Sequence, residues 1–177
     1  MEQKVNVWKA NLTNGLILAL AGITISLLMY FLNLLFNQTL GYVTMLIQIV
    51  VLFFLVKSYR DTFTYGHITY GQALGAGIVI NIYSALIMIL FTYILYTVID
   101  PGLTAKKLAF LEEMMLKKGT PQASVDVFMK MQEKLSKPLI SSIINLFSFI
   151  LMGTIYSLII GIFVKKEGNP LIDTPAN

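Results

Sequence analysis

Four carboxamide side chains are the residues of this sequence whose type and spacing point most directly to chemistry. Each lies in a different long apolar stretch and shares a helical face with small residues: Asn33, Gln48, Asn81 and Asn145. In lipid, such groups hydrogen-bond across the contacts between helices. We therefore predict a polar packing network. The alternative use of the same residues is a polar pocket or a narrow path for a neutral solute or a lipid group.

The residue types that catalysis needs are absent from these stretches, which contain no Asp, Glu, Lys, Arg or His. Proton relays, ion-coupled transporters and charge-ringed channels usually place ionisable groups at membrane depth. The chain has no cysteine, and its one histidine, His67, has no partner at a metal-ligand spacing. Ser141 and Ser142 lack a basic partner that could activate a nucleophile. The sequence thus predicts no enzyme activity, no metal and no cofactor.

The composition indicates that lipid surrounds most of the chain. Of 177 residues, 56% are hydrophobic and 12% are charged, and the mean hydropathy is +0.75. Soluble domains carry about 25% charged residues. The apolar stretches are continuous and do not alternate, which favours helices over a membrane barrel. Because a helix needs about 20 apolar residues to cross a bilayer, the length fits a single integral membrane domain.

The apolar stretches predict four transmembrane helices, at residues 12–36, 41–56, 70–98 and 139–164. Thr69, followed three residues later by Gln72, predicts a capping box at the start of the third. Small residues in this helix fall on two faces. Gly77 lies with Asn81, whereas the GxxxG pair of Gly71 and Gly75 lies on nearly the opposite side. We expect these glycines to make helix contacts, within the chain or, for the GxxxG pair, in a homodimer.

The long hydrophilic segment at residues 101–137 predicts an amphipathic helical hairpin between the third and fourth helices. Asp100-Pro101 and Thr120-Pro121 are helix starts, and apolar residues recur at helical spacing on both segments. The hairpin would lie on the membrane surface or cap the bundle. The fold class is therefore all-α: a four-helix transmembrane bundle with this hairpin. The tail at residues 167–177 contains glycine and two prolines and is expected to be disordered.

The basic residues set the expected orientation and partners. Lys4 and Lys9 precede the first span, the first loop is uncharged, and Lys57 and Arg60 follow the second span. By the positive-inside rule, both termini are cytoplasmic. The seven lysines of the hairpin conflict with this orientation, because they would lie outside. The net charge of +4 suggests contact with anionic lipid head groups. We expect the lipid bilayer, and a membrane-protein partner or homodimer, but no nucleic acid.

Several of these features together resemble a known family. They are four spans, the segment Tyr59-Arg60-Asp61 after the second span, the run Ile68 to Ala73 (ITYGQA), and a long helical loop with proline before the last span. They are similar to the bacterial membrane family catalogued as domain of unknown function four-one-nine-nine. Tyr70 departs from the phenylalanine more usual there. The resemblance implies a four-pass inner-membrane protein of Gram-negative bacteria and assigns no catalytic or ligand residue.

The expected function is that of a non-enzymatic structural or accessory component of the membrane. The alternative is a small transporter or channel subunit for a neutral or lipid-like substrate. The two differ in what surrounds Gln48 and Asn81. A tightly packed, dry core would favour the structural role, and a continuous water-accessible cavity that reaches both residues would favour the alternative.

Overall fold

The computed structural model describes residues 6–166 and folds them into six α-helices. Four are long and apolar enough to cross a membrane, which confirms the predicted all-α bundle. The predicted disorder at residues 167–177 lies outside the described residues. The helices are α1 (Val7–Phe31), α2 (Gln38–Phe63), α3 (Tyr70–Ile94) with a π-helical extension, η1 (Leu95–Ile99), α4 (Leu103–Lys117), α5 (Gln122–Leu135) and α6 (Pro138–Val164).

Capping residues decide where the helices begin. The side chain of Asn6 accepts hydrogen bonds from the backbone N–H groups of Trp8 (3.0 Å) and Lys9 (3.3 Å), so α1 begins several residues ahead of the predicted span. It also ends earlier than predicted, at Phe31. At the start of α3, the predicted capping box of Thr69 and Gln72 is present.

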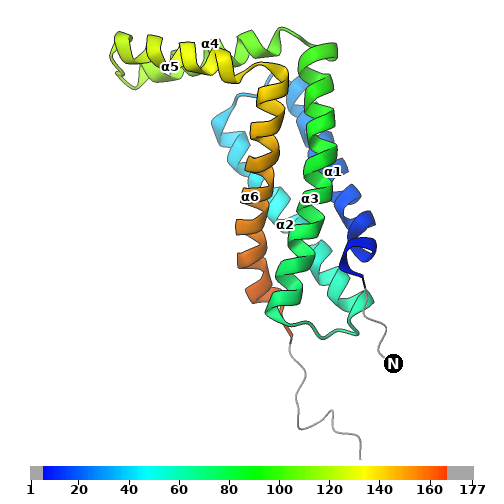
Figure 1. Cartoon of the computed structure of the whole chain (residues 1–177). Coiled ribbons are helices and arrows are strands. Elements are labelled where there is room, and N and C mark those ends of the chain that lie inside the picture. The colour runs from blue at the N-terminus through cyan, green and yellow to red at the C-terminus, as the bar shows by residue number, and fades with distance from the viewer. Residues whose placement is uncertain (1–5, 167–177) are drawn as a thin grey trace, which may run out of the picture.

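The central helix of the bundle is α3, which packs against α1 on one side and α6 on the other (Figure 1). Buried residues gather toward the end of the bundle where the chain passes from α2 to α3. They lie within residues 11–22 of α1, 52–59 of α2, 73–85 of α3 and 153–164 of α6, and we call these segments the closed half. The open half comprises the remaining parts of the four helices, where Leu95 is the only buried residue among those the structure describes.

Backbone and side-chain bonds fasten the outer end of the closed half. Ile68 and Lys166 exchange two backbone hydrogen bonds, of 2.8 and 2.9 Å, and these join the α2–α3 loop to the end of α6. The guanidinium of Arg60 donates to the carbonyl of Val164 (3.1 Å) and pairs with Asp61 (2.7 Å). These bonds tie α2 to α6 at this end.

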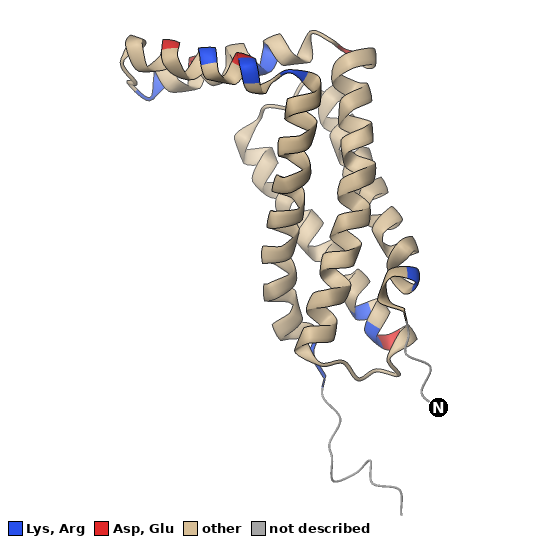
Figure 2. Ribbon diagram, in the orientation of Figure 1, with Lys and Arg blue, Asp and Glu red and all other residues tan. Residues whose placement is uncertain are grey.

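The hairpin of α4 and α5 lies across the bundle axis at the opposite end (Figure 1). It starts from the end of α3, passes the α1–α2 loop, where the rings of Phe36 and Phe110 stack at 5.9 Å, and extends sideways beyond the bundle. Val127 (70% exposed) and Met131 lie on its exposed apolar surface. Charged residues occur in the hairpin and near the other end of the bundle, but not between them in the described chain (Figure 2). This arrangement suits a hairpin at a membrane surface.

Candidate functional site

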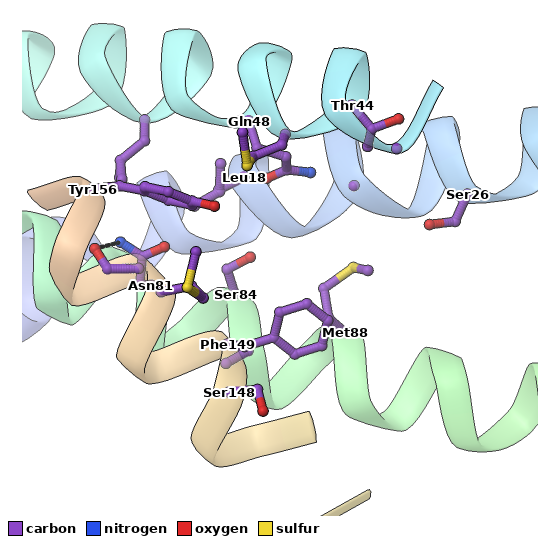
Figure 3. A pocket seen from close by; sticks show the side chains of 17 residues that line it. Leu18, Ser26, Thr44, Gln48, Asn81, Ser84, Met88, Ser148, Phe149 and Tyr156 are labelled. Carbon is purple, nitrogen blue, oxygen red and sulfur yellow. Dashed lines mark hydrogen bonds between the residues drawn. The ribbon is translucent and has the colours of Figure 1, made fainter. Parts of the chain in front are cut away.

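A cavity of about 400 Å³ lies where the closed and open halves meet, and all four bundle helices line it (Figure 3). Small-molecule sites in proteins usually measure about 300–1,000 Å³. Leu18, Met88 and Phe149 provide much of its apolar surface. Its polar side chains are Ser26 of α1, Thr44 and Gln48 of α2, Asn81 and Ser84 of α3, and Ser148 and Tyr156 of α6.

The cavity forms because small residues face one another where α2 loses its packing. Gly22, Gly41 and Ala85 all line it. The first half of α2 buries no residue before Leu52, and α6 buries none before Gly153. Membrane helices associate by close packing of small residues. Where small residues meet no partner, a space remains.

Asn81 closes one side of the cavity by joining α3 to α6. Its Nδ2 donates to the carbonyl of Gly77 on its own helix (2.8 Å) and to that of Gly153 (3.3 Å), the bond drawn in Figure 3. The same nitrogen lies 3.3 Å from the hydroxyl of Ser157. Glycine at position 153 makes room for Asn81, since a Cβ there would come within 2.6 Å of its Oδ1. Asn81 therefore acts as the packing residue that the sequence predicts.

Ser157 completes a reciprocal contact with the opposite helix. Its hydroxyl donates to Gly153 (2.7 Å), and its side chain lies on Gly77, where an added Cβ would come within 2.5 Å of Oγ. Each helix thus supplies a glycine that receives the other's polar side chain. The spacing of four residues, Gly77 to Asn81 and Gly153 to Ser157, repeats on both helices. Sequence reasoning missed the second pair, which this matching spacing could have revealed.

Gln48 lies on the other side of the cavity and has a different environment. It rests against Gly22 of α1, where an added Cβ would come within 2.8 Å of its Nε2. No hydrogen bond joins its carboxamide to another group among residues 6–166. The structure thus brings Gln48 and Asn81 to one cavity, but Asn81 is committed to helix packing whereas the amide of Gln48 keeps its hydrogen-bonding capacity.

The other two predicted members of the polar network lie elsewhere. Asn33 is exposed beyond the end of α1, with a left-handed φ of 56°, so it ends the helix and packs against none. Asn145 lines a second, smaller cavity nearer the hairpin. A single network of four carboxamides is therefore wrong for this fold. The error at position 33 arises because helical spacing alone does not reveal where a helix stops. Asparagine tolerates the left-handed backbone conformation and can therefore follow the end of a helix.

The three predicted contact glycines also separate. Gly77 meets Ser157, as described, but a Cβ added at Gly71 or Gly75 would meet nothing within 4 Å. Within residues 6–166, the expectation that the GxxxG pair packs inside the chain is therefore wrong. Gly71 and Gly75 lie on a face of α3 that the described residues leave open, and the alternative contact, with a second copy or another membrane protein, stays a prediction.

Several polar groups around the cavity have no hydrogen-bond partner in the described chain. They are the side chains of Ser26, Gln48, Ser84, Ser148 and Tyr156, and they come from all four helices. These groups therefore keep hydrogen-bonding capacity for a molecule that enters the cavity. Tyr156 is a lining residue that sequence reasoning missed, although it follows Met152 by four residues and so continues the helical face of Ser148.

The groups that the cavity offers are mostly suited to hydrogen bonding. Among the described residues, Asp, Glu, His, Lys and Arg are missing from its lining, and Tyr156 is its one titratable side chain. Among residues 6–166, no group of three or more His, Cys, Asp or Glu side chains could hold a metal ion. The lining offers hydroxyl and carboxamide groups set in an apolar wall, which is the usual composition of a small-molecule site.

Comparisons with known proteins identify a family. Neither the curated proteins nor the solved structures contain a significant match to this chain. One family model does match, over residues 13–166, and this range includes most of α1, the other three bundle helices, the hairpin and every residue that lines the cavity. The chain therefore belongs to the family described as "Protein of unknown function (DUF4199)".

Proposed function

We propose that this protein is a non-enzymatic accessory protein of the membrane that binds a lipid-like molecule within its helical bundle. One observation carries the proposal: a cavity of about 400 Å³ reaches both Gln48 and Asn81 and is bordered by polar groups without partners in the described chain. The proposal combines the accessory role, which is the first function expected from the sequence, with the lipid-like ligand of the alternative.

The lining limits the ligand to a molecule that is neutral and mostly apolar where it enters the bundle. Among the described residues no charged side chain borders the cavity, and Leu18, Met88 and Phe149 give it apolar walls. A strongly charged solute would lose its hydration without gaining a counter-ion. Acyl chains with an ester or hydroxyl group match such a wall, because Gln48 and Tyr156 can bond to the polar group.

The closed half makes binding a better description than conduction. Leu52, Ile80 and Val56 are each at most 1% exposed and fill the bundle on the side of the cavity away from the hairpin. A continuous pore would have to pass through this packing. The purely structural role is the second candidate, and it is favoured by the reciprocal contact of Asn81 and Ser157.

As part of the same proposal, the protein crosses the inner membrane of a Gram-negative bacterium four times, with both termini in the cytoplasm. The start of α1 and the end of α6 lie at the same end of the bundle (Figure 1), as an even number of crossings requires. Lys57 and Arg60 lie there too, on the side that the positive-inside rule assigns to the cytoplasm. A cysteine at Tyr65, which is 92% exposed, should react with an impermeant maleimide in inverted vesicles but not in spheroplasts. The opposite labelling would reverse the orientation.

The proposed binding is tested by filling the cavity. Gly22→Leu directs a side chain toward Gln48 and Met88, whose flexible ends can shift to accommodate it. After purification in mild detergent, mass spectrometry should find about tenfold less co-purifying lipid on this variant, a loss of about 1.4 kcal/mol in binding. Gly75→Leu is the matched control, because its side chain would enter open space outside the cavity. Equal lipid on the two variants, with unchanged thermal stability, would refute the cavity as the binding site.

A further inference from the structure

The second cavity, of about 180 Å³, lies between the hairpin end of α3, the start of α4 and the start of α6. We propose that it holds the phosphate-type anionic head group of a lipid whose chains enter the larger cavity. This inference rests on the proposed function and adds the chemical class of the ligand. We call this second cavity the head-group site. Its lining includes Thr97, Thr104, Lys107, Ser136, Ser141 and Asn145.

Lys107 supplies the positive charge. Its residue is half-buried, and no carboxylate within the described chain lies within 4.0 Å of its ammonium. The neighbouring Lys106 differs, because it pairs with Asp100 at 2.9 Å. A partly buried ammonium without a protein counter-ion favours an anion from outside the chain. The hydroxyls of Thr97 and Ser141 already donate to backbone carbonyls, but those of Thr104 and Ser136 donate to no group in the described chain and can bond to phosphate oxygens.

Ser136 and the start of α6 provide a second, independent indication. The hydroxyl oxygen of Ser136 is buried and has no hydrogen-bond partner in the described chain. Immediately after it, α6 begins with Pro138, which lines the same cavity, and no side chain caps the helix. The first turn of this 27-residue helix therefore presents its positive dipole end beside Ser136 and without a cap. Both features favour an oxygen-rich anion at this place.

The positions of the two cavities suit one amphiphilic molecule. Both lie along the contact between α3 and α6, and the residues that line one cavity are about one helical turn from residues that line the other. Thr92 of the head-group site follows Met88 of the larger cavity by one turn, and Asn145 precedes Ser148 by nearly one turn. One turn of helix rises about 5.4 Å. The charged site is thus next to the hairpin, at the level of a membrane surface, and the apolar cavity is deeper in the bundle.

Lipid binding by the purified full-length protein tests this inference. Phosphatidylglycerol should bind wild type at least about tenfold more tightly than diacylglycerol with the same chains, because its phosphate can accept a charge-assisted hydrogen bond from the Lys107 ammonium. Lys107→Gln should reduce this preference by about tenfold and leave diacylglycerol binding unchanged. Ser136→Ala should reduce it by a smaller factor. Lys130→Gln is the matched control, since Lys130 is exposed on α5 and does not line the site.

The possible outcomes separate this inference from the proposed function. Equal losses in Lys107→Gln and Lys130→Gln would overturn the head-group site and indicate general attraction to the hairpin. Equal binding of both lipids to wild type would overturn it as well, while keeping the larger cavity as a lipid site. Binding of neither lipid would refute the proposed function itself. Inorganic phosphate is the other possible source of the anion, and acetylation of Lys107 can be measured with phosphate or with phosphatidylglycerol present. If phosphate protects Lys107 as effectively as phosphatidylglycerol does, the anion site is supported and is assigned to free phosphate.

Discussion

The closed and open halves of the bundle are built from the same four helices and have similar apolar compositions, yet only one is tightly packed. In the closed half, glycine meets a polar or aromatic side chain across each main helix contact. Examples are Gly153 with Asn81 and Gly161 with Tyr70. In the open half, Gly41 and Ser148 border a cavity instead. The difference shows that small residues tighten a membrane bundle only where a facing side chain fills the space they leave.

The largest effect is expected from breaking the reciprocal contact in the closed half. Gly77→Leu would place a side chain where the Cβ alone lies 2.5 Å from Ser157 Oγ and 3.6 Å from its Cα, so α3 and α6 must separate. We expect a loss of about 3 kcal/mol in the free energy of unfolding, at the upper end for overpacking. Unfolding in detergent, followed by circular dichroism, measures it. Gly71→Leu, on the open face of α3, should cost much less, and equal losses would show that the two faces do not differ.

A smaller loss is expected at the polar side of the same contact. Asn81→Leu removes the bonds from Nδ2 to Gly77, Gly153 and Ser157, and introduces a branched carbon against Gly153. Interhelical hydrogen bonds in membranes contribute about 0.6 kcal/mol on average and up to about 1.7 kcal/mol, so a loss of about 2 kcal/mol is expected. The same unfolding measurement applies. A variant as stable as wild type would show that packing alone joins these helices.

The corresponding change on the open side should have the opposite sign. Gln48→Leu removes a carboxamide without a partner in the described chain and extends the apolar wall of the cavity. Such changes typically stabilise by about 0.5–2 kcal/mol, and we expect about 1 kcal/mol here. The variant should also retain less co-purifying lipid if the ligand carries a polar group. Destabilisation equal to that of Asn81→Leu would remove the distinction between the two carboxamides and support the structural role for both.

The sequence predicted the fold class well because its signals are strong and local. Continuous apolar stretches define the four bundle helices, and a hydroxyl with a glutamine three residues later marks the start of α3. Helix ends were harder: Asn6 begins α1 early by capping it, and Asn33 takes a left-handed conformation after it ends. Residue type alone does not distinguish an asparagine that begins or follows a helix from one inside it.

The candidate site could be predicted only in part, because a cavity depends on what each face meets. The spacing of Gln48 and Asn81 correctly placed both on inward faces, and the structure brings both to one cavity. The spacing could not show that α2 would lose its packing before Leu52, which creates the space between them. Nor could it show that Gly71 and Gly75 face outward, since both faces of α3 carry glycine. How tightly a residue packs depends on the helix that faces it, so the sequence of one helix alone does not predict it.

The smallest effect concerns the junction between the bundle and the hairpin. The hydrogen bond from the Lys106 ammonium lowers the pKa of the Asp100 carboxyl, which also accepts a hydrogen bond from the N–H of Gly102 (3.0 Å) at the start of α4. A carboxyl whose pKa is lower in the folded state than in the unfolded state stabilises the folded state at pH values above the unfolded pKa, which is near 4. This stabilisation is lost as the pH falls through the lowered pKa of the folded state. We expect the thermal midpoint of wild type to fall upon acidification by more than that of Asp100→Asn. Asp126→Asn on α5, a carboxyl outside this junction, should behave like wild type. If all three midpoints fall equally, Asp100 does not couple the hairpin to the bundle.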